Sequence, residues 1–269
     1  MVQTLSSPSA LPYPITWDKL PDDFILPDEP VDNLNQPSLA AALTEGLANA
    51  GKLSATSLAT TNYGLCARCD QKFVVKAPDW AYMAKLTVPK IQVERSYTPY
   101  LQGDPPAIVM EFISDTDGGE YSIKASYPPG KWFFYEQILK VPYYVLFDWQ
   151  TDALEVYRLN GEGSYQRQIA NEAGRFWIDT VELELGVWWG DRECYHRAWL
   201  RWWTAVGELV PWSSEQVQQE KERAKLERQR AESERQRAES ERQRAESERL
   251  RADRLAALLR SQGIDPDTI

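Results

Sequence analysis

The residue that most needs a chemical explanation is Glu111, which stands inside the nearly continuous apolar run AIVMEFIS, residues 107–114. That run predicts a central, buried strand. Burying an ionised carboxylate there is costly unless a cation or hydrogen bonds compensate. Two explanations stay open: Glu111 pairs with a lysine or arginine, or it holds a divalent metal together with a second carboxylate and a backbone carbonyl. Such hard oxygen donors suit Mg²⁺ or Mn²⁺.

The scarcity of histidine narrows the available chemistry. His196 is the single histidine, so a His-rich zinc or iron centre and any reaction that needs two histidines are excluded. Catalysis would have to use carboxylates and lysines. The 40 acidic residues exceed the 30 basic ones, which argues against nucleic-acid binding through bulk charge. Any contact with DNA must therefore be local.

The cysteines raise the alternative of a zinc site. Cys66 and Cys69 form one close pair, and Cys194 with His196 forms another, but nothing in the sequence brings the two pairs together. Semi-buried free thiols are the preferred interpretation. Three cysteines suit a reducing compartment, and the chain has neither a long apolar run nor a signal-peptide pattern at its start. We therefore expect a soluble, cytoplasmic protein without a membrane partner.

The elements that would position these residues indicate a mixed α/β or α+β domain. Residues 1–37 predict an irregular N-terminal arm, and Ser38 predicts the N-cap of a helix through Ala50 that Gly51 closes. Residues 72–88 predict two strands or one bent strand around Pro78-Asp79. A helix is expected at 131–140, strands at 143–148, 153–159, 164–169 and 175–181, and a hairpin over 197–210. Six tryptophans could stack on bases, but core packing is their commoner use: Trp177, Trp188, Trp189, Trp199, Trp202 and Trp203.

The C-terminal segment, residues 213–269, differs from the domain expected over 38–212. It repeats the heptad ERQRAES and contains 13 acidic and 13 basic residues, so the whole negative excess lies in residues 1–212. Strong helix formers without Gly or Pro before Gly263 predict one helix of roughly 50 residues. Alanines recur every seven residues, but the second apolar position of a coiled-coil heptad is missing before Leu255. We expect a largely solvated helix supported by i,i+4 pairs such as Arg228–Glu232. Weak self-association through the last leucines, or binding of a partner protein, are the alternatives for residues 213–262.

A family resemblance rests on a run of spaced residues. The run begins with Pro78-Asp79 and continues with Glu111, in an apolar strand that ends in Ser114. The later members stand at the spacing that the family shows: Lys131, Tyr135, Val141-Pro142, Tyr144 and Asp148. This pattern resembles the Uma-two family of restriction endonucleases, a branch of the PD-(D/E)XK nucleases, over about residues 38–187. Lys140 replaces the family's glycine before the valine. The resemblance implies a restriction-endonuclease-like mixed sheet flanked by helices, with a metal site at one edge.

The resemblance also implies a set of site residues. Asp79 and Glu111 would bind Mg²⁺ or Mn²⁺, and the carbonyl of Phe112 could add a ligand. A lysine would orient or activate the attacking water. Ile113 occupies the position of the lysine in the plain motif, and Lys131 fits the helix-borne lysine of this branch. Because the segment between Ser114 and Lys131 is extended, Lys124 and Glu120 are rival members of the site.

The function expected from these residues is metal-dependent hydrolysis of DNA phosphodiester bonds. Two carboxylates suffice to hold a divalent metal that lowers the pKa of water and neutralises developing charge, and no histidine is needed. The alternative is a non-catalytic interaction protein that keeps the nuclease fold as a scaffold and recruits partners through its helical tail. The acidic body and the long tail favour that alternative, whereas Asp79, Glu111 and Lys131 favour the enzyme.

Overall fold

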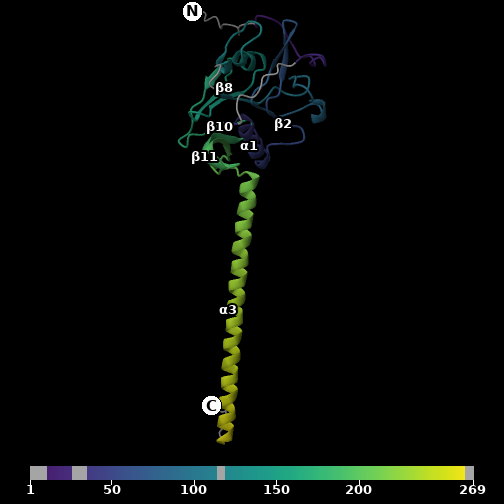
Figure 1. The fold of residues 1–269 in the computed structure, drawn as a ribbon. Helices are drawn as coiled ribbons and strands as arrows, with labels where there is room; N and C mark the ends of the chain where they lie inside the picture. Colours follow the sequence, from purple (N-terminus) through teal and green to yellow (C-terminus); the bar gives the residue numbers. More distant parts are fainter. Residues whose placement is uncertain (1–10, 26–34, 114–118, 264–269) are drawn as a thin grey trace, which may run out of the picture. The chain divides into compact units, whose positions relative to one another are not determined.

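The computed structural model describes residues 11–25, 35–113 and 119–263. The chain divides into two compact units, residues 1–212 and residues 213–269. Among the described residues, the first unit contains three sheets, helix α1 (Asn35–Asn49) and several short helical turns, and the second contains one long helix (Figure 1). The expected α/β fold with a mixed sheet is therefore confirmed. In the described part of the chain, no helix has both the length and the apolar character needed to cross a membrane.

A six-stranded mixed sheet forms the centre of the first unit. Its strands, in spatial order, are β2 (Leu58–Thr60), β5 (Trp80–Met83), β6 (Ile108–Ile113), β7 (Tyr143–Asp148), β8 (Ala153–Leu159) and β9 (Tyr165–Arg167). β6 and β7 pair in parallel, while every other neighbouring pair is antiparallel. The two parallel strands are almost fully buried, as expected for strands covered on both faces.

Two smaller sheets cover the central sheet together with helix α1 (Asn35–Asn49). One contains β1 (Ile15–Thr16), β3 (Leu65–Cys69) and β4 (Lys72–Lys76), and the other contains β10 (Phe176–Ile178), β11 (Leu183–Arg192) and β12 (Tyr195–Trp203). The Trp202 indole of β12 donates a hydrogen bond to the Leu43 carbonyl of α1 at 3.1 Å, and Arg192 of β11 pairs with Glu45 of α1 at 2.7 Å. The sheet of β10, β11 and β12 is thereby joined to α1.

The two faces of the central sheet belong to two separate apolar cores. Side chains alternate along β6, so Ile108, Met110 and Phe112 join the core that contains α1, while Val109 joins the core that contains β3 and β4. Glu111 shares the face of Val109. This second face is covered by α2 (Lys131–Phe133) and the π-helical turn η3 (Phe134–Ile138). The carboxylate therefore lies under the segment that carries Lys131.

Several predicted boundaries were wrong. Helix α1 begins at Asn35, three residues before the proposed cap Ser38, although it does end before Gly51, whose φ is +71°. The helix predicted over 131–140 is one α-helical turn followed by a π-helical turn, in which the Leu139 N–H donates to the Phe134 carbonyl five residues earlier. The ten-residue strand β11 was not predicted. Short η segments lie at Lys90–Gln92 and Gly119–Tyr121.

The second unit is the predicted long helix. α3 runs from Ser213 to Ser261 and has no buried residue. The expected intrahelical pairs do not form: in the described part of α3 from residue 228 onward, no carboxylate lies within 4.0 Å of a guanidinium, whereas Arg223 and Glu227 approach to 3.6 Å. Such exposed pairs contribute only about 0.2–0.5 kcal/mol each, so their absence does not oppose the helix.

Candidate active site

Asp79 and Glu111 come together because β5 and β6 are adjacent. The antiparallel register pairs Trp80 with Met110, and its continuation by one residue sets Asp79 opposite Glu111. The Phe112 N–H donates a hydrogen bond of 2.6 Å to Asp79 Oδ2. That bond holds the Asp79 carboxylate against the end of β6.

Glu111 is buried and has two side-chain donors. Its side chain is 1% exposed; Lys131 Nζ donates to Oε2 at 3.1 Å, and the Tyr135 hydroxyl donates to Oε1 at 2.9 Å. Burial raises the pKa of Glu111 to about 7; the Lys131 charge opposes this rise, and the nearby Asp79 carboxylate adds to it. The two carboxylates therefore act on each other, as they must if they are to share a cation.

Lys131 lies between two carboxylates. Besides Glu111, it contacts Glu120 Oε1 at 3.4 Å, and the Tyr144 hydroxyl donates to the backbone carbonyl of Glu120 at 2.9 Å. Burial by itself would lower the pKa of Lys131, but Glu111 and Glu120 outweigh burial and raise it. The lysine is therefore a charged hydrogen-bond donor at neutral pH.

The structure separates the two rival lysines. Lys131 joins the carboxylate cluster together with Glu120, whereas the side chain of Lys124 is exposed and makes no ion pair within the described residues. The backbone carbonyl of Lys124 accepts a hydrogen bond from the Gly130 N–H at 2.9 Å. The contribution of Lys124 to this region is thus a backbone contact in the extension before Lys131.

Two contacts of the site were missed by sequence reasoning. The Tyr135 hydroxyl bonds Glu111 directly; the position of Tyr135 four residues after Lys131 was a usable signal for it. Gln36, at the start of α1, donates from Nε2 to the Phe112 carbonyl at 3.3 Å. It lies in the segment predicted to be an irregular arm, and no local pattern distinguishes it.

The three cysteines are free, as preferred over the alternative of a zinc site with His196. Cys66 and Cys69 are buried in β3, and burial raises the pKa of both thiols to about 11, so they remain protonated near neutral pH. Cys194 is exposed between β11 and β12, and His196 Nδ1 lies 3.0 Å from Asp191 Oδ1. Among the described residues, no group of three or more His, Cys, Asp or Glu side chains is placed to hold a metal.

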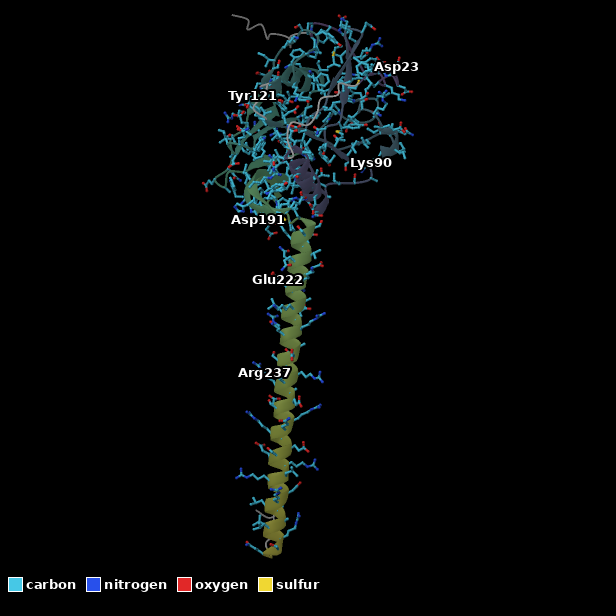
Figure 2. All side chains as sticks on the ribbon, in the orientation of Figure 1. Asp23, Lys90, Tyr121, Asp191, Glu222 and Arg237 are labelled. Carbon is cyan, nitrogen blue, oxygen red and sulfur yellow. The ribbon has the colours of Figure 1, made fainter. Side chains whose placement is uncertain are left out.

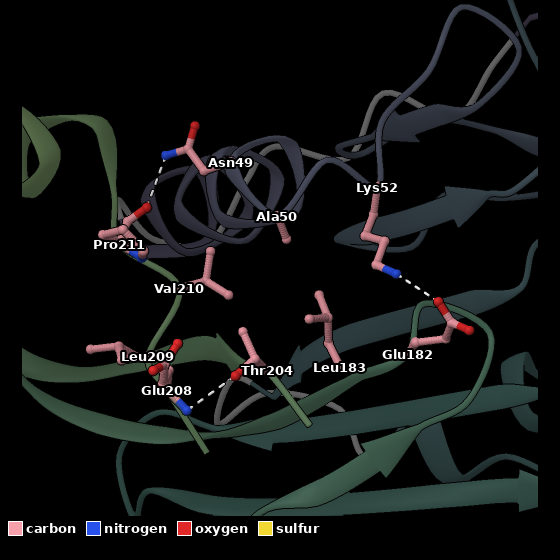
Figure 3. Close-up of a pocket in the computed structure, with 10 residues that line it drawn as sticks. All are labelled: Asn49, Ala50, Lys52, Glu182, Leu183, Thr204, Glu208, Leu209, Val210 and Pro211. Atoms are coloured by element: carbon pink, nitrogen blue, oxygen red, sulfur yellow. Dashed lines mark hydrogen bonds and ion pairs between the residues drawn. The ribbon is translucent and has the colours of Figure 1, made fainter. Parts of the chain in front are cut away.

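The tryptophans divide between core and surface. Trp199, Trp202 and Trp203 are buried, as expected for core residues, whereas Trp177 and Trp189 are 45% and 57% exposed. A separate pocket of about 350 Å³ lies between the end of α1 and the segment after β12, where Asn49 bonds the Pro211 carbonyl and Lys52 pairs with Glu182 (Figure 3). None of the predicted site residues lines it.

A comparison with protein families finds a match over more than half of the chain. The model of the Uma2 family, described as "Putative restriction endonuclease", matches residues 39–192. The chain belongs to the Uma2 family. The Uma2 match spans Asp79, Glu111, Lys131 and Tyr135, and it ends with β11, so β12 and α3 lie outside it. A search of curated proteins finds no match. Membership in Uma2 indicates a nuclease-like function and hence DNA as the class of partner.

Proposed function

We propose that this protein is a metal-dependent endonuclease that hydrolyses phosphodiester bonds of DNA. The observation that carries the proposal is the cluster of Asp79, Glu111 and Lys131, in which a buried carboxylate bonds a lysine at 3.1 Å beside a second carboxylate. A buried ionisable group with a displaced pKa is characteristic of functional sites. The match to the Uma2 family, which spans these three residues, supports the same function.

The donor set fits Mg²⁺ or Mn²⁺. Asp79 and Glu111 supply two anionic oxygens, and their mutual repulsion would be relieved by a shared cation. The backbone carbonyl of Phe112, the residue after Glu111, is the further protein ligand that we propose. When bound, the metal would supply an acidified water and neutralise charge on the phosphate.

The chain's own residues would orient the reactants. Lys131 can donate a hydrogen bond to the attacking water or to a phosphate oxygen, because its ammonium group has three N–H donors. The Tyr135 hydroxyl fixes one oxygen of Glu111, and the Phe112 N–H fixes one oxygen of Asp79. Each carboxylate thus keeps a defined orientation, and Lys131 bonds the second oxygen of Glu111.

The decisive experiment is nicking of supercoiled plasmid with Mg²⁺ or Mn²⁺ and with EDTA as the control. Titration calorimetry with Mn²⁺ on wild type, Asp79→Ala and Glu111→Ala tests the metal site separately. We expect metal-dependent nicking and loss of Mn²⁺ binding in both variants. Unchanged binding in both variants would disprove the metal site. Intact metal binding without nicking on any DNA would favour the non-catalytic scaffold.

A further inference from the structure

The repeat of α3 creates two rows of opposite charge on neighbouring lines of one helix. A central stripe of small or apolar residues recurs every seven residues: Val217, Ala224, Ala231, Ala238, Ala245, Ala252 and Leu259. Three residues after the first five of these positions stands the Glu row: Glu220, Glu227, Glu234, Glu241 and Glu248. Four residues after them stands the Arg row: Lys221, Arg228, Arg235, Arg242 and Arg249.

The two rows border the stripe on opposite sides. At 3.5 residues per turn, a step of four residues turns about 50° one way around the helix, and a step of three turns about 50° the other way. Each of the first five stripe residues therefore has a carboxylate on one side and a cation on the other. This arrangement continues without exception through five heptads, ending where Leu255 and Ala256 replace the charges.

The side chains of both rows are exposed, and of their ten charges only that of Glu227, 3.6 Å from Arg223, is engaged in an ion pair within the described residues. No residue of α3 is buried, and from residue 228 onward the described helix contains no ion pair within 4.0 Å. Figure 2 shows the side chains of α3, Arg237 among them, standing away from the helix.

Two copies of this face are complementary in one orientation only. When two parallel helices face each other across a twofold axis, the Glu row of each copy lies opposite the Arg row of the other, on both sides of the stripe. When one helix is reversed, Glu lies opposite Glu and Arg opposite Arg. Like charges brought together destabilise helix pairing, and opposite charges specify partner and direction.

The period of the repeat also indicates two wrapped helices. A straight α-helix drifts by about 20° per heptad relative to a strict seven-residue pattern, so over six heptads the stripe of an isolated helix winds about 120° around it. A left-handed supercoil removes this drift and keeps the stripe at the contact. Alanine at the centre permits close approach, while Leu255 and Leu259 add apolar area at the end.

We propose that residues 217–259 form a parallel, in-register coiled coil with a second copy of this chain, in which the Glu row of each helix pairs with the Arg row of the other. The missing second apolar position of the heptad is thereby replaced by interchain ion pairs. The assignment does not depend on the proposed nuclease activity, because all of its residues lie outside the Uma2 match.

Cysteine cross-linking of the full chain tests the orientation. In a Cys194→Ser background, Ala231→Cys and Ala245→Cys should each oxidise to a covalent dimer. Gln236→Cys, which lies on the opposite side of the helix, should react at least about tenfold more slowly, because a disulfide requires Cβ atoms about 4 Å apart. An antiparallel pair can bring at most one stripe position together with its own copy. Cross-linking at only one of the two alanine positions would therefore overturn the parallel arrangement.

Charge reversal tests the pairing of the rows. One variant replaces the five residues of the Glu row by Lys, and a second replaces the five of the Arg row by Glu. Sedimentation velocity should show a dimer for wild type, monomers for each variant alone and a dimer for their equimolar mixture, with circular dichroism confirming that both variants keep the helix. A monomeric, helical wild type would overturn the proposal, as would variants that remain dimeric on their own.

Discussion

At the scale of single residues, Glu111 is the residue that chemistry most constrains. One of its carboxylate oxygens accepts a hydrogen bond from Lys131 and the other accepts one from Tyr135. It lies inside an apolar strand, close to the Asp79 charge. A structural ion pair would satisfy the carboxylate with Lys131 alone. Asp79 places a second carboxylate beside it, and two like charges close together raise the free energy of the site, which a shared cation would lower.

The raised pKa of Glu111 predicts an unusual dependence of stability on pH. Since its folded pKa of about 7 lies above the ordinary value of 4.5, the folded state binds the proton more tightly than the unfolded state. This tighter proton binding adds to the free energy of unfolding at low pH, and the added stability is lost as pH rises through about 7. Glu111→Gln removes it, so relative to wild type the variant should gain roughly 1–3 kcal/mol between pH 5 and pH 8. Urea unfolding of both proteins at the two pH values measures this gain. If the difference in free energy of unfolding between the two proteins does not change with pH, Glu111 is ionised over the whole range.

Substitutions of Lys131 and of Lys124 form a matched pair of variants for comparing nicking activity. Lys131→Met removes the donor held between Glu111 and Glu120, so nicking should fall by about 100-fold or more, the usual loss for a positioned proton-transfer or charge-stabilising group. Lys124→Met alters an exposed side chain and should only reduce nicking. The reverse order of effects in plasmid assays would transfer the role to Lys124.

At the scale of elements, the extension before Lys131 packs by backbone contact. Gly130 has no room for a side chain: a Cβ there would lie 2.2 Å from the Ser122 carbonyl oxygen. Gly130→Ala should therefore displace the extension and destabilise the protein by about 1–3 kcal/mol, with a loss of nicking because Glu120 and Lys131 lie on either side. Gly161→Ala is the control, since nothing lies within 4 Å of its added Cβ. Thermal melts of the two variants should differ; equal melting points would contradict the tight packing.

The elements most accurately predicted were those with one dominant signal. The apolar runs of β6 and β7 and the uninterrupted helix formers of α3 left little choice of structure. β11 was missed because Gly186 and Gly190 interrupt its pattern, and β3 because its residues LCARC lack strong β-formers. The π-helical turn was missed because apolar residues at 133, 134, 137 and 138 suit an ordinary α-helix equally well. In the site, the resemblance supplied the residues, and the spacing of Tyr135 after Lys131 was a signal for its contact with Glu111, but only the fold could supply the contact of Gln36.

At the scale of the whole molecule, the two units should be separable. The buried apolar residues described lie between Leu20 and Trp212, and α3 contributes none. A chain truncated after Trp212 should keep a cooperative unfolding transition and its strand signal in circular dichroism, while most of the helical signal disappears. Loss of the transition would show that α3 is needed for the fold of residues 1–212.

The strict unit length of the α3 repeat has a consequence for how this tail can change over evolutionary time. A gain or loss of one ERQRAES unit alters the helix by about 10 Å, at 1.5 Å per residue, yet leaves every remaining residue in the same row. Unequal recombination within such a repeat can therefore lengthen or shorten the tail without a compensating mutation. Insertions of any other length would shift the rows past one another, so tail length is expected to vary among descendants of this gene in whole units of seven residues.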